Sequence, residues 1–351
     1  MKSKRHIKLS DLTTIGLGGE ASEFVSVGSV LELTEALTYA NKKKLSVWVL
    51  SGGSNTVFKD SGFDGLVIKI DLKGITFKSK SGHVFITAFA GENWDDLVKK
   101  AINKNLSGIE SLSGIPGSVG ATPVQNVGAY GQEVSDVITE VKALDRTTFK
   151  EVVFANDECK FEYRSSRFKG RDNGKYIITE VTYRLFEDAA PAVTYLQLKE
   201  KLNELFGTEK ASLKEIRKAV LALRKSKSMV LDKRDPNSRS CGSFFMNPVL
   251  SQKEFSELEA RWKSQRKQVE DIPFFETNDH CIKIPAAWLI EHAGFQKGHQ
   301  HHGVGISQNH SLALVNKNGT VEELLELAGT IRRAVKFKFK IQLEIEPILA
   351  D

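Results

Sequence analysis

Hydrophobic and polar positions follow two periods along this chain, and each period predicts a different kind of element. In the first seventy residues, three short apolar runs indicate strands at 22–27, 47–50 and 66–70. Between the first two, apolar residues recur at helical spacing after Ser29, which predicts a helix capped by that serine. Its buried face is expected to include Leu33, Ala36, Leu37 and Ala40. This region therefore predicts a small α/β unit.

The middle of the chain is rich in predicted strands. Residues 84–90 indicate a strand, and Asn93 is placed to cap a helix that runs through Asn103. Further strand-like runs occupy 137–144, 151–154 and 176–185. This stretch favours an α+β second unit. A break is expected near residues 187–193, where Pro191 and small residues gather.

Helical patterns return beyond that break. At three positions a serine or threonine stands before a predicted helix, with a glutamate three residues later. This is the pattern of a capping box, in which each residue satisfies a free backbone N–H. These pairs are Ser212 with Glu215, Ser251 with Glu254, and Thr320 with Glu323. The last predicted helix presents Leu324, Leu325, Ala328, Ile331 and Val335.

After this last helix the period changes from 3.6 to 2. Residues 341–346 alternate apolar and polar side chains, which predicts a final strand. Glu344 and Glu346 are two positions apart and would share one face of it.

Composition and charge narrow the class of protein. A chain of 351 residues suggests two or three domains. The formal net charge of +6 favours anionic ligands, or simply a solvated surface. The basic residues are scattered, and no basic block interleaved with aromatic residues indicates nucleic acid.

Cysteine usage and hydropathy suggest a compartment. Cys159, Cys241 and Cys281 form no Cys-x-x-Cys pair, which is typical of reduced thiols. The first eleven residues are polar and basic, unlike a secretory signal, and no apolar run is long enough to span a membrane. We therefore expect a cytoplasmic protein without a membrane partner.

Two glycine-bearing loops could approach a phosphate. Residues 16–21 formally match G-x-G-x-x-A, but a strand rather than a helix is predicted to follow, which argues against a Rossmann site. No P-loop pattern is present. The loop 51–55, Ser-Gly-Gly-Ser-Asn, follows an apolar strand. Its backbone N–H groups could form an anion nest suited to a diphosphate, or the loop could be an ordinary tight turn.

The segment 108–131 contains six glycines and no steady periodicity. Long segments without regular structure are usually functional or disordered. Here disorder is not expected, because apolar side chains such as Ile115 and Val119 can pack. We predict an ordered backbone that wraps round a ligand, with Gln125 and Asn126 as side-chain donors.

Four motifs in this order resemble the UDP-N-acetylenolpyruvoylglucosamine reductase family, and the likeness covers nearly the whole chain. They are SGGSN at 51–55, SGIPGSVGATPVQNVGAYG at 113–131, YRSSRFK at 163–169 and CGSFFMNP at 241–248. The resemblance implies an α+β protein. Its FAD-binding fold would be of the vanillyl-alcohol-oxidase type in two subdomains, followed by a C-terminal α+β substrate domain. The expected domains are 1–72, completed by the strand 341–351; 73–188; and 189–340.

The resemblance also implies an activity and its cofactors. The family uses NADPH as co-substrate and non-covalent FAD to reduce an enolpyruvyl UDP-sugar to UDP-N-acetylmuramate in peptidoglycan synthesis. The residues expected to bind FAD are Ser51, Gly52, Gly53, Ser54, Asn55, Ile115, Pro116, Gly117, Gly120, Thr122, Gln125 and Gly128.

Three residues resemble the family's catalytic groups. Arg164 would be the cation that stabilises the developing enolate, because its planar fork can grip a carboxylate. Ser243 would be the proton donor. Glu344 would assist the protonation, although the pattern leaves open whether Glu346 does so instead. The residues alone would favour a surface arginine at Arg164 and a turn serine at Ser243.

The resemblance places the UDP-sugar among six further residues, which are Tyr130, Tyr163, Tyr195, Lys227, Asn247 and Gln300. Thr194-Tyr195 and the stretch 224–227 look like the longer family subtype, in which a tyrosine loop closes over the substrate. A monomer without a nucleic-acid partner is expected.

Three alternatives remain at this level. The chain could be another FAD oxidoreductase of the same superfamily that acts on a small alcohol or hydroxy acid, or a basic nucleotide- or nucleic-acid-binding protein without catalysis. A cluster of histidines could also bind a metal. We interpret it as a surface or pocket-rim loop and predict no metal site, because it has no helical i, i+4 pair with a glutamate and no cysteine nearby. These histidines are His299, His301, His302 and His310.

Overall fold

The protein is described by a computed structural model that covers residues 2–187, 191, 193–208, 210–264, 270–277 and 280–350. The chain divides into two compact units. Unit 1 consists of Met1–Lys8, Glu20–Gly53 and Gly62–Leu231, and unit 2 of Leu9–Gly19, Ser54–Ser61 and Asp232–Asp351. The three predicted domains divide the chain at other points and stay a prediction. Their boundary at 188–189 lies outside the described residues.

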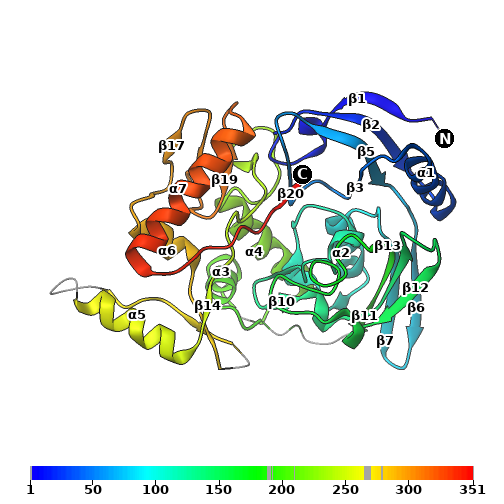
Figure 1. Ribbon diagram of the computed structural model, residues 1–351. Coiled ribbons are helices and arrows are strands. Elements are labelled where there is room, and N and C mark those ends of the chain that lie inside the picture. Colours follow the sequence, from blue (N-terminus) through cyan, green and yellow to red (C-terminus); the bar gives the residue numbers. More distant parts are fainter. Residues whose placement is uncertain are drawn as a thin grey trace. The chain divides into compact units, whose positions relative to one another are not determined.

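The first sheet of unit 1 confirms the predicted N-terminal α/β unit. Its strands are β1 (Lys4–Lys8), β2 (Glu20–Val27), β5 (Phe63–Ile70) and β3 (Val47–Leu50), in that spatial order. β5 pairs parallel with β2 and β3, whereas β1 is antiparallel. Helix α1 (Val30–Lys43) begins where the Ser29 side chain accepts a hydrogen bond from Glu32 N, and it buries the four predicted apolar residues beside this sheet (Figure 1).

The second sheet of unit 1 is antiparallel throughout. Its order is β12 (Glu151–Ala155), β11 (Ile138–Asp145), β13 (Tyr176–Glu187), β7 (His83–Phe89) and β6 (Ile75–Lys80), and the short β8 (Leu106–Ser107) also pairs with β13. Helix α2 (Trp94–Asn103) packs in the same core and is capped by Asn93, as predicted. Strand β6 escaped prediction because most of its side chains are polar and exposed, which is typical of a sheet edge.

A helical pair completes unit 1. Helices α3 (Leu196–Phe206) and α4 (Leu213–Ser226) bury a small apolar cluster between them. The predicted capping box of Ser212 and Glu215 begins α4. The side chains of Tyr130 and Tyr195 pack against the same cluster, so the helical pair supports the end of the glycine-rich segment.

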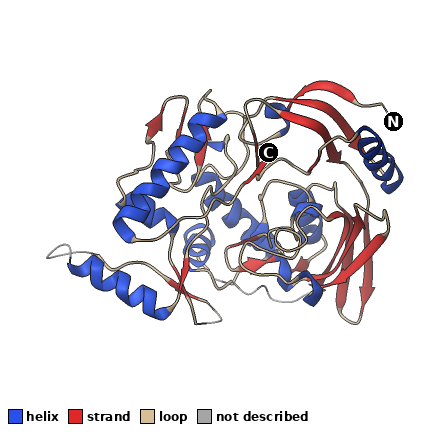
Figure 2. Cartoon of the chain, in the orientation of Figure 1, coloured by secondary structure: helices blue, strands red, loops and turns tan. Residues whose placement is uncertain are grey.

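The described residues of unit 2 form helices and short strands (Figure 2). Helices α5 (Gln252–Ser264) and α6 (Ala286–His292) share a core with α7 (Val321–Phe339). The capping boxes at Ser251 and Thr320 form as predicted. Among the described residues, β14 (Val249–Leu250), β16 (Ile282–Lys283) and β15 (Phe275–Glu276) form one small sheet. A second consists of β17 (Gln300–His301), β18 (Val304–Ile306) and β19 (Leu314–Asn316), and β4 (Thr56–Phe58) pairs with β20 (Ile348–Ala350).

The last strand lies further along the chain than predicted. Residues 341–344 form no strand, Ile345 makes an isolated bridge to Phe245, and the strand proper is β20, which pairs parallel with β4. The predicted alternation is nevertheless present, because Ile341 and Leu343 are buried whereas Gln342 and Glu344 are exposed. The apolar side chains enter the core of unit 2. The alternation therefore arises because every second side chain is buried, although this segment does not pair with a neighbouring strand.

Over the described parts of the chain, no helix combines the length and hydropathy needed to cross a bilayer.

Candidate active site

The two predicted glycine loops meet in unit 1. A Cβ atom added to Gly52 would lie 2.6 Å from the Cα of Gly117, a distance that side chains cannot occupy. The hydroxyls of Ser51 and Ser118 are hydrogen-bonded to each other at the same place. Both loops therefore approach backbone to backbone, and the absence of side chains leaves main-chain groups available to a ligand.

The second loop is fixed to the sheet by backbone bonds. Gly120 N donates to Ala90 O at 2.9 Å, and a Cβ on Gly120 would lie 2.5 Å from that of Ala90. The buried hydroxyl of Thr122 pairs with the hydroxyl of Tyr183 at 2.7 Å. Thr122, a predicted cofactor residue, therefore anchors the loop through its side chain.

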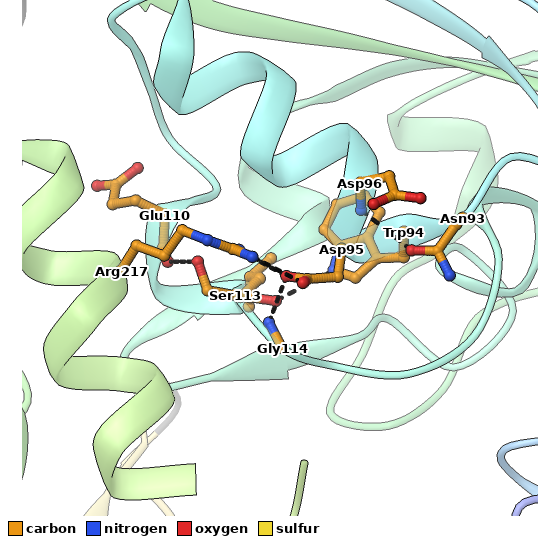
Figure 3. Close-up of polar contacts among 9 residues, drawn as sticks. Asn93, Trp94, Asp95, Asp96, Glu110, Ser113, Gly114 and Arg217 are labelled. Atoms are coloured by element: carbon orange, nitrogen blue, oxygen red, sulfur yellow. Dashed lines mark hydrogen bonds and ion pairs between the residues drawn. The ribbon is translucent and has the colours of Figure 1, made fainter. Parts of the chain in front are cut away.

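An acidic residue of α2 holds the start of this loop (Figure 3). Gly114 N donates to Asp95 Oδ1 at 2.6 Å, and the Arg217 guanidinium of α4 grips both carboxylate oxygens at 2.6 and 2.7 Å. Burial opposes the ionisation of Asp95, but the hydrogen bonds from Arg217 and Gly114 outweigh it and hold the pKa of Asp95 below its ordinary value. This pair was not predicted, since no local sequence pattern joins positions 122 residues apart.

Arg164 lies at the other end of the glycine-rich segment. One terminal nitrogen of its guanidinium donates to Gly128 O at 2.8 Å, and a Cβ on Gly128 would lie 3.3 Å from the other. Arg164 also has a φ of 54°, in the left-handed region that non-glycine residues seldom adopt. The half-buried Arg164 is therefore placed by its surroundings and is not an unconstrained surface arginine.

Three predicted substrate residues come together beyond Gly128. The rings of Tyr130 and Tyr195 lie 5.6 Å apart in an edge arrangement, and Lys227 Nζ lies 5.9 Å from the Tyr130 ring centre. Burial raises the pKa of both tyrosines, so both hydroxyls stay protonated near neutrality. Arg224 is 8 % exposed beside them, and its Nε makes no hydrogen bond. The stretch 224–227 was predicted to lie near the substrate. Within it, Arg224 is distinguished by its burial.

Ser243 belongs to unit 2 and lies beside the C-terminal segment. Glu346 N donates to Phe244 O, and Met246 N donates to Glu344 O, each at 3.0 Å. Asn55 of the first glycine loop donates from Nδ2 to Glu346 O at 3.3 Å. Unit 2 therefore brings together the predicted proton donor, both candidate glutamates and one predicted cofactor residue.

The two glutamates differ in their surroundings. Glu346 is half-buried and lies opposite Phe244, directly after Ser243, whereas Glu344 is exposed and lies opposite Met246. The geometry of this segment therefore favours Glu346 as the carboxylate near Ser243.

The remaining predicted residues have separate environments. Asn247 Oδ1 accepts a hydrogen bond from Ala286 N at the start of α6, an orientation that leaves Nδ2 to donate to a ligand. The Tyr163 ring lies 5.2 Å from the Arg164 guanidinium, and Gln300 is exposed in β17. The others, half-buried in the two loops except for the buried Gly53, are Gly53, Ser54, Ile115, Pro116 and Gln125.

Comparison with known proteins identifies the family. Residues 235–350 match the family model "UDP-N-acetylenolpyruvoylglucosamine reductase, C-terminal domain", and residues 21–148 match "FAD binding domain". The UDP-N-acetylenolpyruvoylglucosamine reductase of Thermobifida fusca is 42% identical over 98% of this chain and 97% of its own, and that of Salinispora arenicola is 40% identical over 98% and 94%. The chain belongs to the UDP-N-acetylenolpyruvoylglucosamine reductase family.

A solved reductase of this family has the same fold. The enzyme from Thermus caldophilus aligns over 100% of both chains with a TM-score of 0.67, at 24% sequence identity. Together with the FAD-binding match, this likeness confirms the predicted fold class. The reductase C-terminal match includes Ser243 and both glutamates, and the FAD-binding match includes both glycine loops.

Replacing Asp95 tests the support of the second loop. A carboxylate with a lowered folded pKa stabilises the protein above its unfolded pKa of about 3.9, and this stability is lost as pH falls through the folded value. Asp95→Asn should therefore lower the free energy of unfolding by about 1–3 kcal/mol at pH 7, because Arg217 loses its charged partner. Below pH ~4 the difference from the parent protein should shrink. Urea unfolding at several pH values measures both effects.

Asp96→Asn is the matched control, since Asp96 is exposed on the same turn of α2. An equal loss of stability in both variants, or a loss from Asp95→Asn that does not change with pH, would contradict the role given to the Asp95–Arg217 pair.

Proposed function

We propose that the protein reduces the enolpyruvyl group of UDP-N-acetylglucosamine enolpyruvate to give UDP-N-acetylmuramate, with FAD as its cofactor and NADPH as reductant, in peptidoglycan synthesis. Family membership across nearly the full chain supports this activity. The observation that carries the proposal is the pairing of the Ser243 segment with the glutamate-bearing C-terminal segment. It brings together the segments that carry Ser243 and Glu346, which are about a hundred residues apart in the chain.

The residues present fit FAD. Gly52 and Gly117 carry no side chains where the two loops approach each other, which suits a diphosphate bound by backbone N–H groups. The residues that would hold the cofactor are 51–53 and 113–120, with Ser54 and Asn55 as further donors. FAD, when bound, carries hydride from NADPH to the substrate.

An anionic substrate calls for cationic residues. The enolpyruvyl carboxylate gains charge as the double bond accepts hydride at its terminal carbon, so a cation placed in advance lowers the barrier. Arg164, held by Gly128, is the residue we assign to this carboxylate. Lys227 and Arg224, beside Tyr130 and Tyr195, are assigned to the diphosphate and uridine end.

The second chemical step calls for a proton donor. The carbon that bears the carboxylate must be protonated after hydride addition, and the half-buried Ser243 hydroxyl is the donor we assign. A serine is a weak acid, so it needs a strongly basic acceptor and a fixed position. The backbone bonds of Phe244 to Glu346 and to Leu312 fix the segment that follows Ser243. We assign Glu346, rather than Glu344, to assist this step.

Three further features belong to the proposal. The enzyme is cytoplasmic, which agrees with its three free cysteines. It acts as a monomer, and it has neither a nucleic-acid nor a membrane partner.

Turnover with the enolpyruvyl UDP-sugar tests the proposed function. The purified protein should be yellow, and NADPH oxidation should require the UDP-sugar and consume the two substrates in equal amounts. If NADPH reduces the flavin but the UDP-sugar is not turned over, the protein would instead be another FAD oxidoreductase. A colourless protein that cannot be reconstituted with FAD would contradict the cofactor assignment.

Ser243→Ala should separate the two half-reactions. Flavin reduction by NADPH should continue at the parent rate, whereas reoxidation by the UDP-sugar should slow by about 10²–10⁴-fold, the usual contribution of a general acid. Stopped-flow absorbance of the flavin measures both rates. Ser256→Ala, on the exposed face of α5, is the control and should leave both rates unchanged. Similar losses in both half-reactions would show that Ser243 is structural.

A pair of glutamate variants decides between the two carboxylates. Glu346→Gln should slow flavin reoxidation by about tenfold or more, because a neutral amide cannot supply charge to the protonation step. Glu344→Gln should stay close to the parent rate, since that side chain is exposed. Single-turnover kinetics of both variants measure the two reoxidation rates. If Glu344→Gln is the slower variant, the role belongs to Glu344.

A further inference from the structure

Two histidines and a glutamate outside the proposed catalytic machinery gather in unit 2. His301 and His302 lie in the hairpin of β17 and β18, and Glu326 lies on α7. One potential ligand atom from each lies within 4.8 Å of the other two. The sequence spacing did not predict this group, because the third member comes from a helix further along the chain.

The hairpin is held against α7 independently of these side chains. Gly303 N, which follows His302, donates to Glu323 Oε2 at 3.2 Å, and Lys317 N donates to Gly303 O at 2.8 Å. Glu323 is the capping-box residue of α7, and Glu326 follows it by three positions on the same face. The backbone therefore fixes the two histidines and the glutamate beside each other before any ligand binds.

The geometry of the closest pair suits a shared cation. His301 Nε2 and Glu326 Oε2 lie 3.2 Å apart, yet this nitrogen is buried and makes no hydrogen bond. Two ligands that each bind zinc at 2.0–2.1 Å in tetrahedral geometry lie about 3.3 Å apart. The His302 ring, 4.6 Å from that of His301, is exposed and can rotate to supply the third ligand.

We propose that His301, His302 and Glu326 bind one Zn²⁺ ion, with water as the fourth ligand. Two imidazoles and one carboxylate are typical zinc ligands, whereas Mg²⁺ and Ca²⁺ prefer sites made of oxygen alone. The ion joins the β17–β18 hairpin to α7 and so stabilises unit 2. The main competing explanation is a simple ion pair between His301 and Glu326, which needs no metal.

Calorimetric titration with ZnCl₂ tests the site. The protein is used as the full-length holoenzyme without a histidine tag, after treatment with a chelator. The parent should bind one Zn²⁺, and its melting temperature should rise with the zinc concentration. Mg²⁺ should give neither effect. X-ray absorption at the zinc edge should show imidazole ligands with nitrogen and oxygen at about 2.0–2.1 Å.

Three single variants locate the ligands. His301→Ala, His302→Ala and Glu326→Gln should each weaken zinc binding by about tenfold or more. His302→Ala is the safest, because its side chain is exposed and its loss leaves the core unchanged. His299→Ala, in the same segment but outside the group, should bind zinc as the parent does.

Unchanged zinc affinity in the double variant His301→Ala, His302→Ala would overturn the proposal. So would the absence of zinc binding by the parent protein, or an equal loss of affinity in His299→Ala. Circular dichroism of the zinc-free variants confirms that each remains folded, so that a lost affinity reports the ligand and not the fold.

Discussion

The backbones of Gly52 and Gly117 lie so close that no side chain fits between them. The neighbouring elements of unit 1 hold both loops in this position. The parallel strands of the first sheet deliver one loop, and the N-terminus of α2 holds the other through Trp94 N and Asp95. Because main-chain atoms make the contact, its position depends on the elements that support the loops, together with the side chains of Ser51, Ser118 and Thr122. The Asp95–Arg217 pair is such a support, and it links the second loop to α4.

The same helix α4 also ends in the cationic part of unit 1. Arg224 and Lys227 lie at its C-terminus, beside the two tyrosines, while Arg217 near its middle holds Asp95. One helix therefore positions both the loop that would bind the cofactor and the residues assigned to the diphosphate of the substrate. Burial of Arg224 keeps a cation where water cannot fully solvate it, so an anionic ligand would gain more from it than from a surface arginine.

Local patterns predicted most elements, because caps and periods are local. Ser29, Asn93 and the capping boxes at Ser212, Ser251 and Thr320 mark helix starts through bonds that span three residues. The edge strand β6 was not predicted, since most of its side chains are exposed and it lacks the expected alternation. The last strand was placed too early, since residues 341–344 alternate in burial without pairing to a strand. The site residues came from a family resemblance. What sequence could not supply were long-range facts: the Asp95–Arg217 pair, the burial of Arg224 and the different surroundings of Glu344 and Glu346.

The pairing of β4 with β20 has a consequence for the order of folding. Thr56 is opposite Ile348, so these strands are separated by nearly the whole chain. A ribosome that works from the N-terminus releases residues 9–19 and 54–61 long before the rest of unit 2 exists. Unit 1 can collect its own long-range partners by Leu231, whereas unit 2 cannot close until its last strand has been made. Because such distant contacts form slowly, the early segments of unit 2 would stay exposed during synthesis. Chaperones would bind the apolar surface of these segments.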